Sequence, residues 1–399
     1  MRPVIRPFRP DDRAAVNALH RSVAWPGRSP QGWRWLDDNP ARQEADAPSG
    51  WVAADADDRP QAFVGNFVQR FCAADGSVLH GATGFSIIVG DAARGAAHGL
   101  IRAVLRQPGM SVHYTLNANP RAARLYPRHG LEPWPTKTHA AKLAWVTDPW
   151  VCGVGKALRS LAHRRQGLEE RLGERLTNGR LTRPRPFVLP AETVALDRFG
   201  DTSAWGDYWR ALLSSSPGLV ADRSPEAMRW RLANPDLPRQ PYVLAAVRRG
   251  RIRAHLTAMV AKGGGLEPPA LEILDLMALP GERAAARSLV QCLFDNAKRL
   301  GAAKVRLQVV DGSTLDLLGD LVDGARMEGG WGHGHARFAP AHEADFRAGW
   351  TPTPYDGDYS FCTRSAAALA GVYANTTPAS TRQAFKHVSV GGLSPLAEP

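Results

Sequence analysis

The sequence is poor in cysteine, with four in 399 residues, and none of the four belongs to a C-x-x-C pair. Zinc clusters and disulfide-stapled scaffolds need closely spaced cysteines, so the pattern argues against both and suits a reducing cytoplasm. No stretch approaches the roughly 20 apolar residues of a membrane-spanning helix. The first residues, Met1 to Arg6, lack the apolar core of a secretory signal. We therefore expect a cytoplasmic globular protein.

Acidic residues are in deficit, because 38 Asp and Glu face 50 Lys and Arg, which gives a net charge of +12. A basic surface favours anionic partners such as phosphorylated cofactors, nucleic acid or anionic lipid. The segment from Lys156 to Arg185 alone holds nine Lys or Arg and three Glu. No helix-turn-helix, zinc-finger or RNP-like pattern accompanies this charge, so nucleic-acid binding is not expected.

Two segments of the chain share the pattern W-x-x-x-N-P, at Trp35–Pro40 and at Trp230–Pro235. Each is followed by an apolar run that opens on an aromatic residue, Trp51 in the first case and Tyr242 in the second. A turn and a second apolar run come next in both. Matching landmarks at nearly equal offsets indicate an internal duplication.

Both copies predict the same order of elements: a helical opening, three strands, a helix, a strand and a second helix. This order is typical of a mixed α/β unit, that is, an α+β unit around a mixed sheet. In the first copy, the third strand, the helix, the next strand and the last helix are expected at 84–89, 96–106, 112–116 and 120–128. We predict domains at 1–147 and 189–375, and a disordered tail at 376–399.

The segment between the copies, 148–188, predicts a basic amphipathic helix or helical pair, because apolar residues recur at helical spacing from Trp150 to Leu176. Two roles are open for it. The favoured one is a connector packed on both domains. The other is a peripheral contact of 150–176 with an anionic membrane.

The segment from Gly84 to Arg106 carries the first chemical signature. An apolar strand ends at Val89, and the small residues Gly95 and Gly99 then open a helix beside Arg94. Backbone N–H groups at such a helix start, together with the helix dipole, suit a pyrophosphate. The second signature follows a further strand, where residues 119–131 read N-x-x-A-x-x-L-Y-x-x-x-G-L.

These two segments resemble the GNAT (Gcn5-related N-acetyltransferase) superfamily. The acyl-CoA loop of that family reads Arg/Gln-x-x-Gly-x-Gly/Ala. Arg94, Gly95 and Gly99 match a common form of it, while Ala97 stands at the usual central glycine. The second signature matches the family pattern at every fixed position. The resemblance covers about 1–145 well and 190–375 in outline, and it implies two GNAT-like acyl-CoA N-acyltransferase domains in tandem.

The resemblance also implies a cofactor and roles for residues. Acetyl-CoA or another acyl-CoA would be the co-substrate, without a metal. Tyr126 would act as general acid and protonate the leaving thiolate. A backbone N–H of the splayed strand, near Ile88 or Val89, would hold the oxyanion. The residues expected to bind the cofactor are Ile88, Val89, Arg94, Gly95, Ala97, His98, Gly99 and Asn119.

A general base is harder to identify in the first copy, whose long strand carries Ser86 but no carboxylate. His80, just before that strand, is our candidate, with a plain surface histidine as the alternative. In the second copy, Glu272 and Asp275 would lie on opposite faces of a regular strand, so that one could contact the substrate in a cleft. That copy lacks both signatures and carries Glu282 where phosphate would bind, so we interpret it as degenerate.

Two features near the end of the chain complete the candidates. Gly332–His335 reads Gly-His-Gly-His, which offers only two metal ligands, so a flexible loop is expected there. The carboxylates of Asp356 and Asp358 could face an acceptor cleft, but a simple turn is favoured.

We therefore predict an acyl-CoA-dependent N-acyltransferase, in the first instance an N-acetyltransferase, that moves an acyl group directly to a primary amine of a small molecule or sugar. The acceptor, the acyl chain length and the oligomeric state stay open at this point. Two alternatives are a non-catalytic CoA-sensing or scaffold protein, and an aminoacyl transferase of the Fem type. The latter also pairs two GNAT-like units and uses a charged tRNA.

Overall fold

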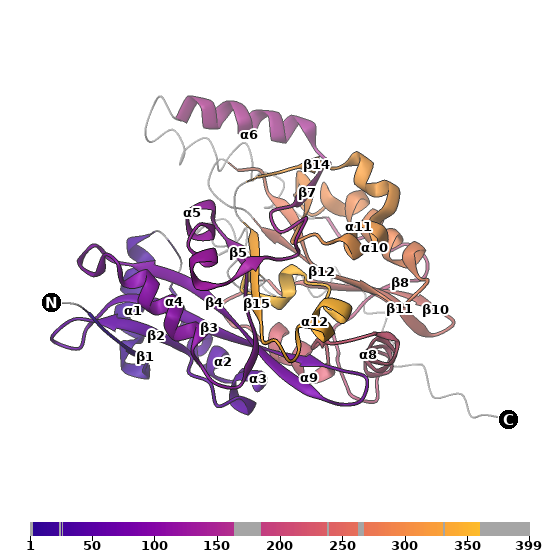
Figure 1. Ribbon diagram of the computed structural model, residues 1–399. Coiled ribbons are helices and arrows are strands. Elements are labelled where there is room, and N and C mark those ends of the chain that lie inside the picture. Colours follow the sequence, from indigo (N-terminus) through magenta and orange to yellow (C-terminus); the bar gives the residue numbers. More distant parts are fainter. Residues whose placement is uncertain are drawn as a thin grey trace. The chain divides into compact units, whose positions relative to one another are not determined.

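The computed structural model describes residues 3–23, 25, 27–162, 185–237, 239–261, 267–329 and 332–359 (Figure 1). The chain divides into two compact units. The first draws on Met1–Ala141, Leu213–Leu237 and Gly329–Cys362, and the second on Lys142–Leu212, Pro238–Glu328 and the remaining residues. The predicted tail and most of the predicted 148–188 helical segment lie outside the described residues.

The first unit is built on a mixed sheet of order β1-β2-β3-β4-β5-β15-β6, with β9 pairing β3 as well. Only β4 and β5 run parallel, and every other neighbouring pair is antiparallel. The strands are β1 (Val4–Pro7), β2 (Gly50–Ala54), β3 (Pro60–Cys72), β4 (Val78–Val89), β5 (Met110–Ala118), β6 (Glu132–Pro133), β9 (Val220–Ala221) and β15 (His333–Phe338).

The second unit has a sheet of the same design, in the order β14-β7-β13-β12-β11-β10-β8, in which β12 and β13 form the parallel pair. The mixed α/β fold class predicted from the sequence is thus confirmed. The strands are β7 (Lys142–Val146), β8 (Thr193–Ala195), β10 (Tyr242–Arg248), β11 (Arg251–Ala261), β12 (Ala270–Ala278), β13 (Lys304–Gln308) and β14 (Arg326–Met327).

The two sheets exchange strands between the halves of the chain. β15 comes from the C-terminal half, yet it pairs with β5 in the first unit, while β7 comes from the N-terminal half and pairs with β13 in the second. Each sheet is therefore completed by a strand of the other copy. The predicted domains, 1–147 and 189–375, follow the sequence repeat. The compact units combine segments from both halves of the chain. The predicted domain boundaries therefore stay a prediction.

Helices cover both faces of the first sheet because successive strand residues point to opposite faces. Val52 and Phe63 pack under α1 (Arg13–Ser22) and α2 (Pro30–Asp37), while Ala53 and Val64 pack under α4 (Ala96–Leu105). The short helix α3 (Pro40–Glu44) lies along β3. In the second unit α10 (Arg283–Ala297) covers β10 to β13, and α11 (Gly312–Leu318) packs beside α10. Most of α8 (Ala204–Ser215) also belongs to this unit.

The tryptophans of the repeated pattern contact each other inside the first unit. Trp35 on α2 stacks on Trp230 of α9 (Pro225–Leu232), with ring centroids 4.7 Å apart and planes at 4°. Each indole Nε1 donates to the backbone carbonyl of the other tryptophan, at 2.7 and 2.8 Å. Both helices begin in the same way, with a serine cap, Ser29 or Ser224, and a proline after it. Such a reciprocal contact is what two-fold related segments make, and it supports the duplication.

This reciprocity yields a prediction with an internal control. Trp35→Phe and Trp230→Phe each remove one indole donor and leave one carbonyl unpaired, so each should lower the free energy of unfolding by about 1–2 kcal/mol. The two losses should be nearly equal, and the double variant should lose less than their sum because the rings are in contact. Urea unfolding of the four proteins measures this. Additive losses of very different size would contradict the reciprocal contact.

Helix α6 (Pro149–Ala162) is the helix described within the predicted 148–188 segment. Trp150 is 78% exposed and Leu161 is 51% exposed, and Lys156 and Arg159 are exposed beside them. None of the described helices is both long and apolar enough to cross a membrane. Residues 163–176 of the predicted membrane contact lie outside the described part of the chain, so both the connector and the membrane role stay predictions.

Candidate functional site

The parallel strands β4 and β5 separate partway along the first sheet. Their pairing runs from His80 opposite Met110 to Thr83 opposite Tyr114 and ends there. Just beyond, β4 has a bulge at Ser86, whose φ of 51° lies in the left-handed region that a serine seldom adopts. Backbone groups of β4 that would have faced β5 are thereby left beside the gap between the strands. We call this gap the split.

A cavity lies at the vertex of the split, where the two strands begin to separate. Most of its lining is apolar, and the polar lining groups come from β5 and from Tyr126. The residues that line it are Val64, Ala82, Gly84, Ile87, Ile101, Val104, Leu105, His113, Tyr114, Thr115, Tyr126 and Leu131. Apolar pockets with a few polar groups are the usual form of a ligand site.

The other end of the split opens at the start of α4. Gly95 caps this helix with a φ of 93°, a conformation that favours glycine, and an added side-chain carbon there would meet no atom within 4 Å. Ala97 and His98 lie in the first turn. Glycine at position 99 is needed for a different reason, because a side-chain carbon there would come within 2.2 Å of Ile5 on β1. The helix start is thus free of side chains at Gly95, while Gly99 lets α4 approach the sheet.

Charged and ring groups surround this helix start. Arg94 is 83% exposed, and its guanidinium donates to the Asp91 carboxylate at 3.0 Å. His98 Nδ1 lies 3.0 Å from His129 Nε2, so one of the two imidazoles donates to the other. Burial lowers the pKa of His129, and the neighbouring His98 and Arg102 lower it further. The predicted Ile88 and Val89 lie at the end of β4 that leads into this turn.

Asn119 and Tyr126 follow β5 at the edge of the split. Asn119 caps the short helix α5 (Pro120–Ala123) by accepting a hydrogen bond from the Ala122 N–H at 2.8 Å, so its side chain has a structural use. Tyr126 begins the single turn η3 (Tyr126–His129), where the sequence predicted a continuous helix over 120–128. Burial raises the pKa of Tyr126 to about 12, although a hydrogen bond with the Thr115 side chain acts in the opposite direction. The phenol is therefore protonated at neutral pH.

The exchanged strand β15 adds groups that sequence reasoning did not place here. His335 pairs opposite Thr115, and its ring lies 5.6 Å from that of Tyr126. Burial lowers the pKa of His335 to about 4, helped by His139 and His333, whose rings are about 6 Å from each other. No three metal-type side chains among the described residues are placed to hold a metal ion. The flexible loop expected at 332–335 is wrong, because 333–338 pair as a strand.

The turn predicted from Asp356 onward directly follows the short helix η5 (Pro354–Asp356), and the two share Asp356. Asp356 is fully buried, and its carboxylate accepts hydrogen bonds from Arg223 at 2.5 Å and from Trp350 Nε1 at 2.9 Å. The Tyr114 hydroxyl donates to the Asp356 backbone carbonyl. Asp358 is close enough to Tyr126 to raise its pKa. The segment thereby anchors against β5 beside the cavity.

His80 does not join the other candidates. It lies within β4, not before it, and its Nε2 is 3.2 Å from a carboxylate oxygen of Glu44. At roughly 3.3 Å per strand residue, Thr83, where the pairing with β5 ends, is only about 10 Å further along the strand. His80 is not among the residues that line the cavity, and its ring lies beside Glu44, so its use as the base stays a prediction.

The second sheet has a bulge in the equivalent strand, β12, and the carboxylates beside it are paired with other side chains. β12 carries an extra residue at Leu274, after the β12–β13 pairing ends at Ile273. Because of this bulge Glu272 and Asp275 face the same side, opposite Met259 and Thr257, and not opposite sides as expected for a regular strand. Both are fully buried. Glu272 accepts from Arg306 Nε at 2.7 Å and Asp275 lies 2.9 Å from His255 Nε2, so internal partners occupy both carboxylates.

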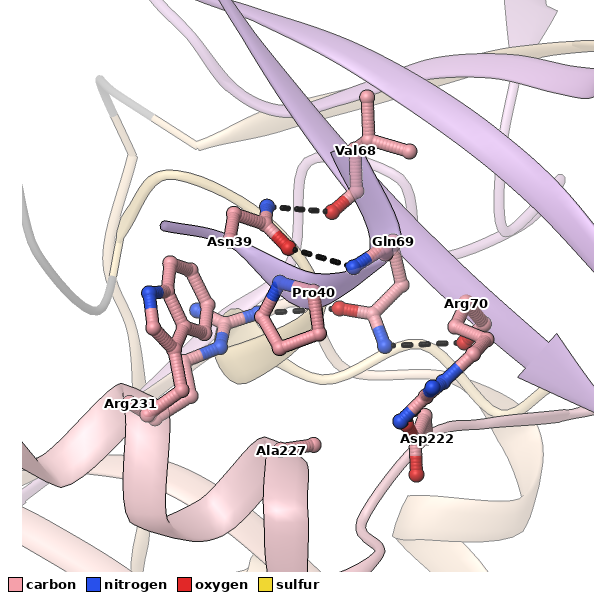
Figure 2. A pocket seen from close by; sticks show the side chains of 10 residues that line it. Asn39, Pro40, Val68, Gln69, Arg70, Asp222, Ala227 and Arg231 are labelled. Atoms are coloured by element: carbon pink, nitrogen blue, oxygen red, sulfur yellow. Dashed lines mark hydrogen bonds and ion pairs between the residues drawn. The ribbon is translucent and has the colours of Figure 1, made fainter. Parts of the chain in front are cut away.

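A second pocket in the first unit lies between β3 and α9 (Figure 2). Figure 2 shows its polar groups turned toward one another. Asn39 Nδ2 donates to the Val68 carbonyl at 2.9 Å, and Gln69 Oε1 accepts from Arg231 at 3.0 Å. Arg70 pairs with Asp222 at 2.6 Å. This self-paired set is typical of a packing junction, and it gives the Asn-Pro of the repeated pattern a structural role.

No family model matches the chain, and no curated protein matches it. Similar chains are found among solved structures. A GCN5-related N-acetyltransferase from Anabaena variabilis is 15% identical over 84% of this chain and 73% of that one, with a TM-score of 0.48. One from Kribbella flavida is 13% identical (84% and 71%, TM-score 0.46), and Eis1 from Mycobacterium abscessus is 16% identical (84% and 73%, TM-score 0.44). These similarities are weak, so no activity follows from them.

Proposed function

We propose that the first unit binds an acyl-CoA in the split between β4 and β5 and transfers its acyl group to a primary amine of a small molecule or sugar. The observation that carries the proposal is the split itself: one end opens at the start of α4, and the other ends in a cavity beside Tyr126. A long cofactor with an anionic end and a thioester end matches this arrangement.

The anionic end of the cofactor fits the start of α4. The free N–H groups of the first turn and the helix dipole favour a pyrophosphate, and the left-handed Gly95 leaves the approach open. The pantetheine arm would then run along the split, where backbone groups of β4 beyond Thr83 offer hydrogen bonds in place of β5. The thioester would then lie at the vertex, next to Tyr126.

The chemistry needs no covalent intermediate on the protein. The amine nitrogen attacks the thioester carbon, a C–N bond forms, and the C–S bond breaks as the oxyanion collapses. A backbone N–H of β4 between Thr83 and the bulge at Ser86 would stabilise the oxyanion, because Ile88 and Val89 lie nearer the other end of the split. Tyr126, held in the protonated form by its raised pKa, would give its proton to the leaving thiolate. The acceptor ammonium would lose one proton to an ordered water before the attack. The second proton, which the nitrogen loses as the amide forms, would return through water to the Tyr126 phenolate.

Calorimetric titration with acetyl-CoA tests this binding mode. The wild type should bind one molecule per chain, and Arg94→Glu should weaken binding by on the order of tenfold, because a negative charge would replace a positive one at the anion end of the split. Arg34→Glu is the matched control, since Arg34 is also exposed but lies on α2, across the sheet from α4. Equal losses in both variants would speak against phosphate binding at Arg94.

The same titration separates the alternatives. Two sites per chain would show that the second copy also binds. Binding without turnover of any primary amine would favour the CoA-sensing or scaffold role. Absence of acyl-CoA binding would reject the proposal, and strong salt-dependent tRNA binding in that case would favour the Fem-type role.

A further inference from the structure

The cavity at the vertex extends beyond the point where a cofactor arm would end. α4 runs back along the sheet from the open end of the split, so Val104 lies near Gly84 while Gly95 lies at the far end. The cavity is lined by the second half of α4, through Ile101, Val104 and Leu105, and by none of its first turn. A thioester that enters from the start of α4 would therefore direct its acyl group into this cavity.

The size of the cavity limits the acyl chain. About 30 Å³ is open to the centre of a water-sized sphere, and a single water needs about 10–15 Å³ by this measure. The space therefore takes two or three non-hydrogen atoms in sequence. The methyl group of an acetyl would leave part of it empty, and a long fatty chain would not fit without displacement of Leu105 or Leu131.

One wall of the cavity carries an unmatched hydrogen-bond acceptor. His113 on β5 is 6% exposed, and its Nε2 has no hydrogen-bond partner among the described residues. The imidazole already bonds the backbone of Val104, which leaves the lone pair of Nε2 as the unused group. Burial and the nearby Arg337 lower the pKa of His113 to about 4, so the ring is neutral. A buried acceptor without a donor is unfavourable, and a ligand hydroxyl there would remove that cost.

We propose that this cavity is the acyl pocket and that it selects a short acyl group of three or four carbons whose hydroxyl donates to His113 Nε2. The inference rests on the proposed function and names the acyl class for the same site. Apolar side chains of α4 and β4 would contact the carbon chain, and His113 would discriminate hydroxylated from plain chains, as sites with a buried polar group do.

The test titrates free CoA, acetyl-CoA, butyryl-CoA and 3-hydroxybutyryl-CoA into the wild type and His113→Phe by calorimetry, without an acceptor. In the wild type butyryl-CoA should bind about tenfold more tightly than acetyl-CoA, from two additional buried methylenes. The 3-hydroxybutyryl thioester should gain on the order of a further tenfold. His113→Phe should lose only this last gain, and its affinity for free CoA should equal that of the wild type.

A second variant guards against misfolding of the first. Ala82→Val narrows the cavity from the β4 side, so it should weaken butyryl-CoA and leave free CoA unchanged. Equal affinities for acetyl-CoA and butyryl-CoA in the wild type, or no advantage of the hydroxyl, would overturn the acyl assignment while free CoA still bound. Failure of free CoA to bind would instead overturn the proposed function, and the acyl assignment with it.

Discussion

Replacement of Tyr126 by phenylalanine is expected to lower kcat of acyl transfer by roughly 10²- to 10⁴-fold, the usual contribution of a general acid. Affinity for the acyl-CoA should stay within a factor of about two, since the aromatic ring and its contacts with the cavity are kept. The measurement is release of the CoA thiol in the presence of the primary amine found by screening. A loss confined to kcat identifies an interaction made in the transition state.

The pH profile adds an independent check. The Tyr126 phenol is in its acid form up to about pH 12, well above the ordinary value for tyrosine, because burial disfavours the phenolate. Its ionisation therefore cannot produce an alkaline loss of rate below that pH. The wild-type rate should instead rise as the acceptor ammonium deprotonates, and then level off.

Tyr355→Phe provides the matched control, because it keeps the ring and removes a tyrosine hydroxyl of the same unit, one that contacts the Met228 sulfur at 3.2 Å. That variant should keep the wild-type kcat. Full activity in Tyr126→Phe would show that Tyr126 only packs its turn against β5, and would leave the thiolate to be protonated by solvent.

The parts of the candidate site that the sequence predicted are those encoded by contiguous residues. The turn before α4 is a local structure, so Gly95 and the helix that follows it could be recognised from their order alone. The same holds for Asn119, whose cap and following turn are set by the next few residues. These two segments flank the split in the structure, and their spacing in the sequence reflects the β4–α4–β5 connection between them.

The groups that sequence reasoning missed come from pairings between distant residues. His335 reaches Tyr126 only because β15 joins β5 across more than 200 residues, and no local pattern reports which sheet a strand will join. Thr115 and His113 looked like ordinary strand residues. Their relevance follows from the separation of β4 and β5, which sequence periodicity does not show.

Irregular strands account for the candidates that the structure places elsewhere. Regular alternation along a strand predicts Glu272 and Asp275 on opposite faces of the sheet. The bulge at Leu274 adds one residue to β12, so that the two side chains lie on the same face. The sequence predicts His80 before a short strand, whereas β4 begins at Val78 and includes His80 in the stretch that pairs with β5. A one-residue bulge and a longer strand are both invisible to a pattern of apolar residues.

Breaking the buried ion pair between Arg223 and Asp356 should have the largest effect on stability. Arg223 and Asp356 are 1% and 0% exposed, and removal of either partner leaves the other charge buried without compensation. Arg223→Ala should therefore lower the free energy of unfolding by about 3–5 kcal/mol. Urea unfolding followed by tryptophan fluorescence measures it, since Trp350 donates to the same carboxylate.

An exposed ion pair of the same unit separates this effect from the loss of any arginine. Arg94 and Asp91 are 83% and 95% exposed, so Arg94→Ala should change the free energy of unfolding by less than about 0.5 kcal/mol. A small loss in Arg223→Ala would mean that water reaches Asp356 and that the η5 turn is not anchored. In the anchored case, Arg223→Ala should also weaken acyl transfer at temperatures where the protein is still folded. The reason is that Asp356 holds Tyr114, and the same segment brings Asp358 to Tyr126.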